Sequence, residues 1–393
     1  MISTPFTGGG RVAGVAAGVA AAGLGLTALG GLADPRQALA SYLVAFVYWL
    51  GLALGALILL GAFHASKARW PVVLRRFLET IPQTIPLFVV LFIPIALGLR
   101  HLFLWADPGA LSGELLHLVE HKRPFLNVPF FLARAALYFA VWIGVASVLR
   151  ALSVRQDATG GHELTRRQRA LGAGSLPFLA LTLSFAAFDW MMSLDPRFYS
   201  TMFGVYWFAG SFMGVFAILI VAAAATRADP AHFGHHLNAD HVHSLGKFLL
   251  AFTAFWAYIG FSQFMLIWIA NIPEEVPWYV VRTDSPWGKV GIFLAVGHFL
   301  VPFFLLLSRD LKRSVKPLAR VASWLLLVHL VDIHWIVMPR LHPDGPSPSW
   351  MDLTAFVGVG AAALAFLVFR MRGAATVPVR DPYLEESLRY QPQ

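Results

Sequence analysis

The sequence predicts an all-α membrane protein with ten transmembrane helices. Three observations point to this fold class: hydrophobic residues make up 58% of the chain, charged residues only 13%, and the mean hydropathy is +0.67. A soluble globular domain carries about 25% charged residues. We therefore expect the chain to bury its apolar surface in a lipid bilayer.

Ten apolar runs are each long enough for a helix that crosses a hydrocarbon core of ~30 Å, which takes about 20 residues. In order, they cover residues 12–32, 39–63, 81–104, 128–149, 175–194, 200–225, 248–272, 290–307, 315–337 and 353–369. The first run follows Arg11 and resembles a signal peptide, but without it the alternation of basic segments breaks down, so we count it as a span. An even number of spans places both termini on one side.

Basic residues are unevenly distributed between the two sides that this topology defines. Most of the 30 Lys and Arg residues fall in segments on the side of the termini. Because basic loops stay in the cytoplasm, both termini are predicted to be cytoplasmic. A basic inner collar against anionic lipid also accounts for the net charge of +9, so nucleic-acid binding is not expected.

The chain contains no cysteine. A thiolate-held iron–sulfur cluster, a thioether-attached haem and a disulfide are therefore excluded. If electrons pass through this protein, a partner subunit has to receive them.

Short sequence echoes suggest an internal duplication. The echoes are Val47-Tyr48-Trp49 with Val205-Tyr206-Trp207, each followed by a pair of glycines; Phe131-Leu132-Ala133 with Phe293-Leu294-Ala295; and Asp189-Trp190 with His334-Trp335. Their order predicts two four-helix bundles related by a parallel repeat, plus one flanking helix at each end. The corresponding units are residues 1–36, 37–197, 198–345 and 346–393. Many transporters are instead built from inverted halves.

Ionisable and amide side chains inside the predicted spans are the candidate functional residues. A charged residue at such a depth costs about 2.5–3.5 kcal/mol on insertion scales, so it needs a partner or a function. The candidates for proton transfer are Asp189, His329, Asp332 and His334, and those for a ligand pocket or proton path are Arg134, Gln263 and His298.

Helical geometry sorts some of these residues. His329 and Asp332 are three positions apart and share a face, whereas His334 lies about 200° around the helix from Asp332. Arg134 is a plausible counter-charge for either Asp189 or Asp332. Most of the group falls in the outer half of the bilayer.

Acids and imidazoles in an apolar environment can exchange protons near neutral pH. A quinone head group needs such an environment, with apolar walls and a proton-exchanging side chain near each oxygen. The structural alternative is that Asp189 simply pairs with Arg134, or that His334 caps a backbone carbonyl. A haem between His298 and His329 and a metal at the histidines of residues 232–243 are less favoured readings, and we predict neither.

Two segments resemble signature segments of the large membrane subunits of bacterial alternative complex III, in the polysulfide reductase NrfD superfamily. They are residues 188–204, FDWMMSLDPRFYSTMFG, and residues 255–275, FWAYIGFSQFMLIWIANIPEE. The resemblance extends to ten spans over nearly the whole chain, and the length is similar to the shorter of the two paralogous membrane subunits.

The resemblance implies a quinol:cytochrome c oxidoreductase complex of the bacterial inner membrane. Its implied partners are a paralogous NrfD-like membrane subunit, an iron–sulfur subunit, multihaem and monohaem cytochrome c subunits and a terminal oxidase. The implied cofactor is menaquinone or ubiquinone. This subunit would contribute a quinone pocket or a proton path.

Two other functions are kept open. A proton-coupled secondary transporter would use the same buried acids, although the sequence lacks paired helices broken by Gly or Pro. A purely structural scaffold subunit of the same complex would need none of the acids to react.

Overall fold

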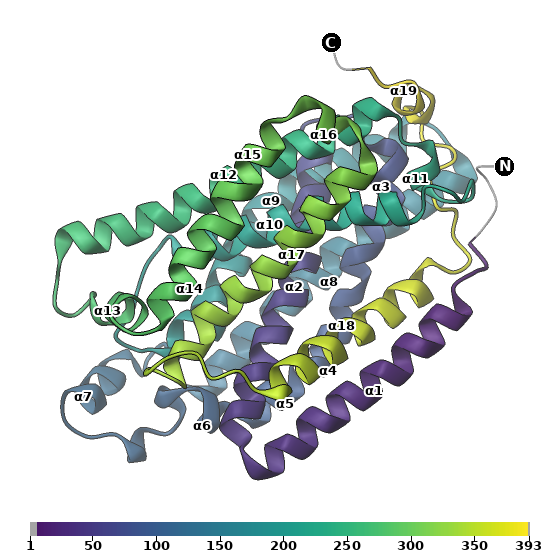
Figure 1. Ribbon diagram of the computed structural model, residues 1–393. Helices are drawn as coiled ribbons and strands as arrows, with labels where there is room; N and C mark the ends of the chain where they lie inside the picture. The colour runs from purple at the N-terminus through teal and green to yellow at the C-terminus, as the bar shows by residue number, and fades with distance from the viewer. Residues whose placement is uncertain (1–5, 392–393) are drawn as a thin grey trace.

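The computed structural model describes residues 6–391, and every regular element in that range is a helix (Figure 1). Ten helical segments are long and apolar enough to cross a membrane, which confirms the predicted class of multi-pass helical membrane protein. Six are single helices: α1 (Gly10–Ala33), α2 (Pro35–Ala65), α8 (Val128–Thr159), α10 (Phe203–Ala225), α12 (Ala239–Ala270) and α18 (Trp350–Met371). A seventh, α17 (Val315–Val337), continues into the short helix η6 (Met338–Arg340). An eighth, α9 (His162–Trp190), continues into the short helix η4 (Met192–Leu194).

The third and eighth spans are interrupted helices, so the expectation that the chain lacks a pair of broken helices was wrong. The third consists of α3 (Val72–Thr80), η1 (Ile81–Thr84), α4 (Ile85–Leu91) and α5 (Ile93–Leu97), and prolines stand at 82, 86 and 94. Proline lacks a backbone N–H and clashes with the preceding turn, so it divides the span. The eighth consists of α14 (Trp287–Leu294), the π-helical segment η5 (Ala295–Leu300) and α15 (Val301–Leu307).

Both termini lie at the same end of the bundle, as the even number of spans predicts (Figure 1). We refer to this end as the terminal end and to the opposite one as the far end. The short helices α6 (Leu99–Leu102), α7 (Gly113–Lys122) and α13 (Pro277–Thr283) lie at the far end. At the terminal end lie α11 (Phe233–His236), α16 (Arg309–Arg313) and α19 (Leu384–Leu388).

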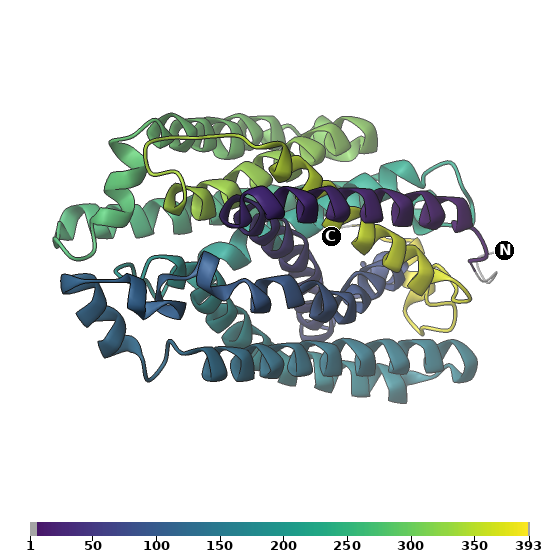
Figure 2. The same ribbon diagram turned by 90° about the horizontal axis from the view of Figure 1, so that it is seen from below.

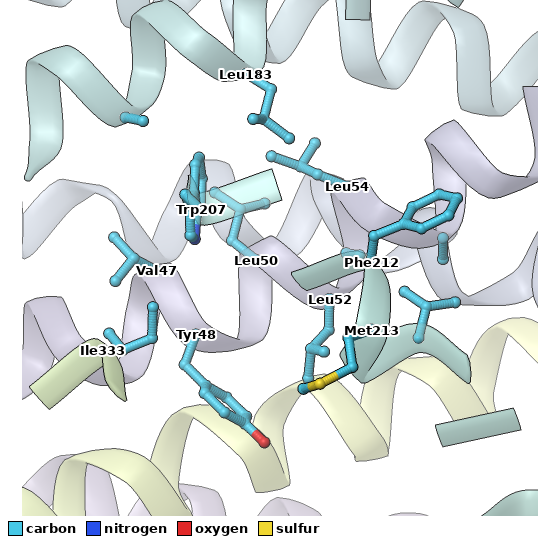
Figure 3. Close-up of a cluster of buried hydrophobic side chains, with 14 of the residues drawn as sticks. Val47, Tyr48, Leu50, Leu52, Leu54, Leu183, Trp207, Phe212, Met213 and Ile333 are labelled. Carbon is cyan, nitrogen blue, oxygen red and sulfur yellow. The ribbon is translucent and has the colours of Figure 1, made fainter. Parts of the chain in front are cut away.

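Helix α2 forms the centre of the bundle, with 89% of its most apolar stretch buried. It packs against α9, α10, α17 and α18. Side chains of α2 and α10 interlock in this core (Figure 3). A Cβ on Gly51 would lie 2.5 Å from Ser211 Oγ, and one on Gly55 would lie 2.9 Å from Val215, so these glycines let the two helices cross closely.

The two copies of the Val-Tyr-Trp motif therefore lie on helices that contact each other in the core. The division of the chain into two repeated four-helix bundles remains a prediction.

The first and last spans, α1 and α18, pack side by side along their length at the edge of the bundle (Figure 2). The contact is built from small residues. A Cβ on Gly23 would lie 2.8 Å from the Cα of Gly358, and Thr27 and Thr354 share a hydrogen bond of 2.9 Å. Small residues allow this close approach, which is how helices associate in a membrane.

A buried ionic cluster surrounds Glu79 near the terminal end. Its carboxylate lies 3.1 Å from Arg75 Nε, 3.6 Å from Arg76 Nη1 and 3.3 Å from Arg150 Nη1. Arg75 also pairs with Asp381 at 2.7 Å, which ties the C-terminal segment to α3. Burial makes each of these charges dependent on the others.

Candidate functional site

Asp332 on α17 is buried and has no arginine or lysine within ion-pair distance among the described residues. Its Oδ1 accepts a hydrogen bond from the Tyr206 hydroxyl of α10 at 2.5 Å, and its Oδ2 accepts one from Trp256 Nε1 of α12 at 3.0 Å. Both donors are neutral. The Asp332 carboxyl group therefore has hydrogen-bond donors but no counter-charge in an apolar interior.

Two histidines extend this cluster towards the middle of the bundle. His329 Nδ1 lies 3.5 Å from Asp332 Oδ2, and the ring centroids of His329 and His298 are 5.9 Å apart. The four ring nitrogens have no hydrogen-bond partner among residues 6–391. Unsatisfied buried polar atoms are costly and call for an explanation, such as a proton path or bound water.

Two backbone features make space for the imidazole rings of His298 and His329. His298 belongs to the π-helical segment η5, and π-helical turns are frequent at functional sites. Gly210 of α10 faces His329, where a Cβ would lie 2.5 Å from the ring. His298 packs on Trp256, at a centroid distance of 3.9 Å. The indole that donates to Asp332 therefore also holds His298 in place.

A cavity of about 650 Å³ lies beside the cluster, between α12, α13 and α14. Its walls are mostly apolar, and Tyr206 and Trp256, the two donors to Asp332, are part of them. Other lining residues, Tyr258, Phe261 and Ile292, are exposed on the outside of the bundle. The cavity therefore opens sideways, where a bilayer or a neighbouring subunit would lie, and one hydrogen bond separates its wall from Asp332.

Three polar side chains, Gln263, Tyr279 and Arg282, line the cavity among its apolar residues. Gln263 accepts from Ser200 and donates to the Tyr279 hydroxyl, both at 3.0 Å. Arg282 is buried and donates to the backbone oxygens of Trp278, Trp335 and Ile336 at 2.7–3.2 Å. Burial lowers the pKa of Arg282 to about 9, which still leaves it cationic at neutral pH. The cavity thus combines apolar walls with a few fixed donors, as ligand sites do.

Asp189 occupies a different environment from Asp332. Arg134 donates two hydrogen bonds to its carboxylate, at 2.6 and 2.9 Å, and Tyr138 donates a third at 2.8 Å. Arg134 also donates to the Phe125 carbonyl and packs over the Phe125 and Phe130 rings. A bidentate pair of this kind gives the Asp189 carboxyl group a fixed counter-charge. Of the two partners predicted for Arg134, the structure gives Asp189.

His334 lies on another face of α17 from Asp332, as the helical geometry predicts. Its Nε2 is 3.6 Å from Asp352 Oδ2 on α18. Asp352 also accepts from Ser41 at 2.6 Å and Gln37 at 3.3 Å. His334 thus belongs to a polar network between α2, α17 and α18, apart from the cavity.

The structure therefore brings together four of the seven residues singled out in the sequence: Gln263 lines the cavity, and His298, His329 and Asp332 lie behind its wall. Arg134, Asp189 and His334 lie elsewhere. Sequence reasoning missed Tyr206, Trp256 and Arg282. Trp256 and Gln263 are seven positions apart on one helix face, which was an available signal.

Within residues 6–391, no three His, Asp or Glu side chains are close enough together to hold an ion.

No protein-family model and no curated protein matched the chain.

Proposed function

We propose that this protein is a quinone-binding, proton-transferring membrane subunit of a respiratory oxidoreductase of the alternative complex III type. One observation carries the proposal: a sideways-opening apolar cavity of about 650 Å³ is separated from the uncompensated acid Asp332 only by the Tyr206 hydroxyl. The acid, the relay and the pocket are then parts of one site.

The cavity suits a quinone for three reasons. Its volume falls within the range of about 300–1,000 Å³ that is typical of ligand pockets. Its apolar walls and exposed rim match a ring that carries a long hydrocarbon tail and arrives from the bilayer. Gln263 and Tyr279 supply hydrogen-bonding groups at one end. These residues would hold menaquinone or ubiquinone.

Quinol oxidation releases two protons and two electrons. The Tyr206 hydroxyl can take up a proton from the cavity side while it passes its own proton to Asp332 Oδ1, because the two oxygens are 2.5 Å apart. His329 Nδ1, at 3.5 Å from Oδ2, is placed to accept the proton next. His298 continues this line of titratable groups towards the middle of the bundle.

Electrons need a separate route, because a chain without cysteine provides no thiolate ligands for an iron–sulfur cluster. We propose an iron–sulfur partner subunit, then multihaem and monohaem cytochrome c subunits, and a terminal oxidase beyond them. A paralogous NrfD-like membrane subunit completes the proposed assembly. The proposed location is the bacterial inner membrane with both termini in the cytoplasm, which the distribution of Lys and Arg supports.

The first test asks whether the cavity binds a quinone. Gly291 lines the cavity, and a Cβ there would have only ordinary contacts, the nearest at 3.8 Å, so Gly291→Phe fills the cavity from α14. Gly144→Phe adds the same ring on the outer face of α8. We expect Gly291→Phe to abolish photolabelling by an azidoquinone, with Gly144→Phe unaffected. Equal labelling of both variants would contradict a quinone site here.

The second test concerns Asp332. Asp332→Asn keeps both hydrogen-bond acceptance at one oxygen and side-chain size, but it cannot carry a proton. In the purified complex, we expect quinol oxidation to fall at least tenfold while azidoquinone labelling is retained, with partial rescue by Asp332→Glu. Normal turnover and proton release by Asp332→Asn would instead favour a scaffold. Quinone-independent solute uptake in vesicles would favour a transporter.

A further inference from the structure

A second cavity, of about 560 Å³, lies at the terminal end between α2, α9 and the C-terminal segment. It is separate from the quinone cavity, because its lining comes from the last residues of α2 and the first turns of α9. Three basic side chains line it against one acidic side chain. The basic ones are Lys67, Arg166 and Arg169, and the acidic one is Glu163.

Arg169 is the most informative of these residues. It is half-buried, and its guanidinium has no hydrogen bond or ion pair among the described residues. The guanidinium lies over the ring of Tyr383, 4.9 Å from its centroid. By contrast, Glu163 is held by Arg166 and Arg167 at 2.7 and 3.0 Å. Arg169 therefore presents an uncompensated cation to the cavity.

His64 adds a buried polar group to the lining. Only 5% of this residue is exposed, and its Nε2 has no hydrogen-bond partner within residues 6–391. It occupies the crossing of α2 and α9, where a Cβ on Gly172 would lie 2.6 Å from His64 Cβ. The close helix contact thus places an unpartnered imidazole beside the basic residues.

The rim has two kinds of surface. Lys67 follows the last turn of α2 in a left-handed conformation, with φ 55°, and is exposed. Ala170 and Ala173 on α9 also line the cavity and are exposed, but they are apolar. Positive charge and small apolar side chains therefore meet at the edge of a membrane-spanning helix.

We propose that this cavity binds a phosphate-ester anion. Arg169 would form the bidentate contact that guanidinium makes with phosphate, and Lys67 would contribute a further donor. Two sources share this chemistry: the headgroup of an anionic phospholipid from the adjacent leaflet, and a free phosphate. The exposed alanines provide a path for acyl chains, which a free phosphate does not need.

The test uses the purified full-length protein after delipidation by detergent exchange. Its thermal unfolding is followed with dihexanoyl phosphatidylglycerol, with dihexanoylglycerol, which lacks phosphate, and with inorganic phosphate. A saturable stabilisation by phosphatidylglycerol alone supports the site with lipid as its source. Stabilisation by inorganic phosphate as well supports it with free phosphate as a ligand. No stabilisation, or an equal effect of dihexanoylglycerol, overturns the proposal.

Variants locate the effect. Arg169→Gln should weaken phosphatidylglycerol binding about tenfold or more, since a hydrogen bond to a charged group contributes about 1.5–3 kcal/mol. Arg155→Gln, at an exposed arginine outside the cavity, is the matched control.

Lys67→Gly keeps the test valid if Arg169→Gln misfolds. It removes a charge at a position whose positive φ glycine adopts without strain, so folding is retained while affinity falls. Unchanged affinity in Arg169→Gln and Lys67→Gly would overturn the assignment to this cavity.

Discussion

The Tyr206 hydroxyl lies 2.5 Å from Asp332 Oδ1 while the Tyr206 ring forms part of the cavity wall. One side chain thus joins the space where a ligand would sit to the acid that would exchange its proton. Tyr48, the residue that echoes Tyr206 in the sequence, donates instead to the backbone oxygen of Leu326 at 2.9 Å. The same residue type in an echoed motif therefore has two different partners.

This difference gives a matched pair of substitutions. Tyr206→Phe removes the hydroxyl relay and leaves one oxygen of Asp332 without a donor, so we expect quinol oxidation by the assembled complex to fall tenfold or more. Tyr48→Phe keeps the ring that packs beside His329 and removes only the hydroxyl that donates to the Leu326 carbonyl, so turnover should stay within about twofold. Steady-state quinol oxidation measures both variants. Equal activities would remove Tyr206 from the proposed relay.

We expect the ion pair between Arg134 and Asp189 to stabilise the folded protein. Arg134→Met leaves the buried Asp189 without its cation, which should cost about 3–5 kcal/mol of unfolding free energy. The double variant Arg134→Met/Asp189→Leu removes both charges and should recover most of that loss. Denaturant unfolding in detergent, arranged as a double-mutant cycle, measures the coupling. Additive effects of the two substitutions would show that the pair is not coupled.

The contrast between Asp189 and Asp332 shows how far sequence can go. Both acids could be placed in the outer half of a span from the length of the apolar runs and the topology. Which acid Arg134 meets depends on the rotation of α8 against α9, and a single sequence does not contain that angle. Only the structure distinguishes the paired acid from the unpaired one.

The fold class, by contrast, could be predicted from the length of the apolar runs. About 20 apolar residues in a row have few alternatives to a membrane-spanning helix, so the number of spans follows from the sequence, although the third covers Val72–Leu97 and not residues 81–104. The interruptions within spans are harder to predict. Prolines 82, 86 and 94 mark the broken third span, and Pro302 follows the π-helical segment that carries His298, but a proline does not specify which kind of interruption forms. The cavity depends on side chains from several helices and could not be predicted.

The ionic cluster at the terminal end yields a third prediction. Glu79→Gln leaves Arg75, Arg76 and Arg150 close together without their shared carboxylate, which should destabilise the protein by about 3–5 kcal/mol. Glu163→Gln also removes a carboxylate that two arginines hold, but on the surface, where such pairs contribute about 0–1 kcal/mol. Thermal unfolding of both variants separates the two cases. Similar small losses would mean that water reaches Glu79.

The contact between α1 and α18 gives the last prediction. A side chain on Gly23 would collide with the Gly358 backbone at 2.8 Å, and backbone cannot move aside as a flexible side chain can. Gly23→Leu should therefore displace α1 from α18, while Gly14→Leu, where nothing lies within 4 Å, should not. Because α1 is at the edge of the bundle and only 22% of its apolar stretch is buried, the other nine spans should remain folded. Cysteines at Thr27 and Thr354, whose hydroxyl oxygens are 2.9 Å apart, provide the measurement. Disulfide formation between them should be lost with Gly23→Leu and kept with Gly14→Leu, and cross-linking in both would contradict close packing at Gly23.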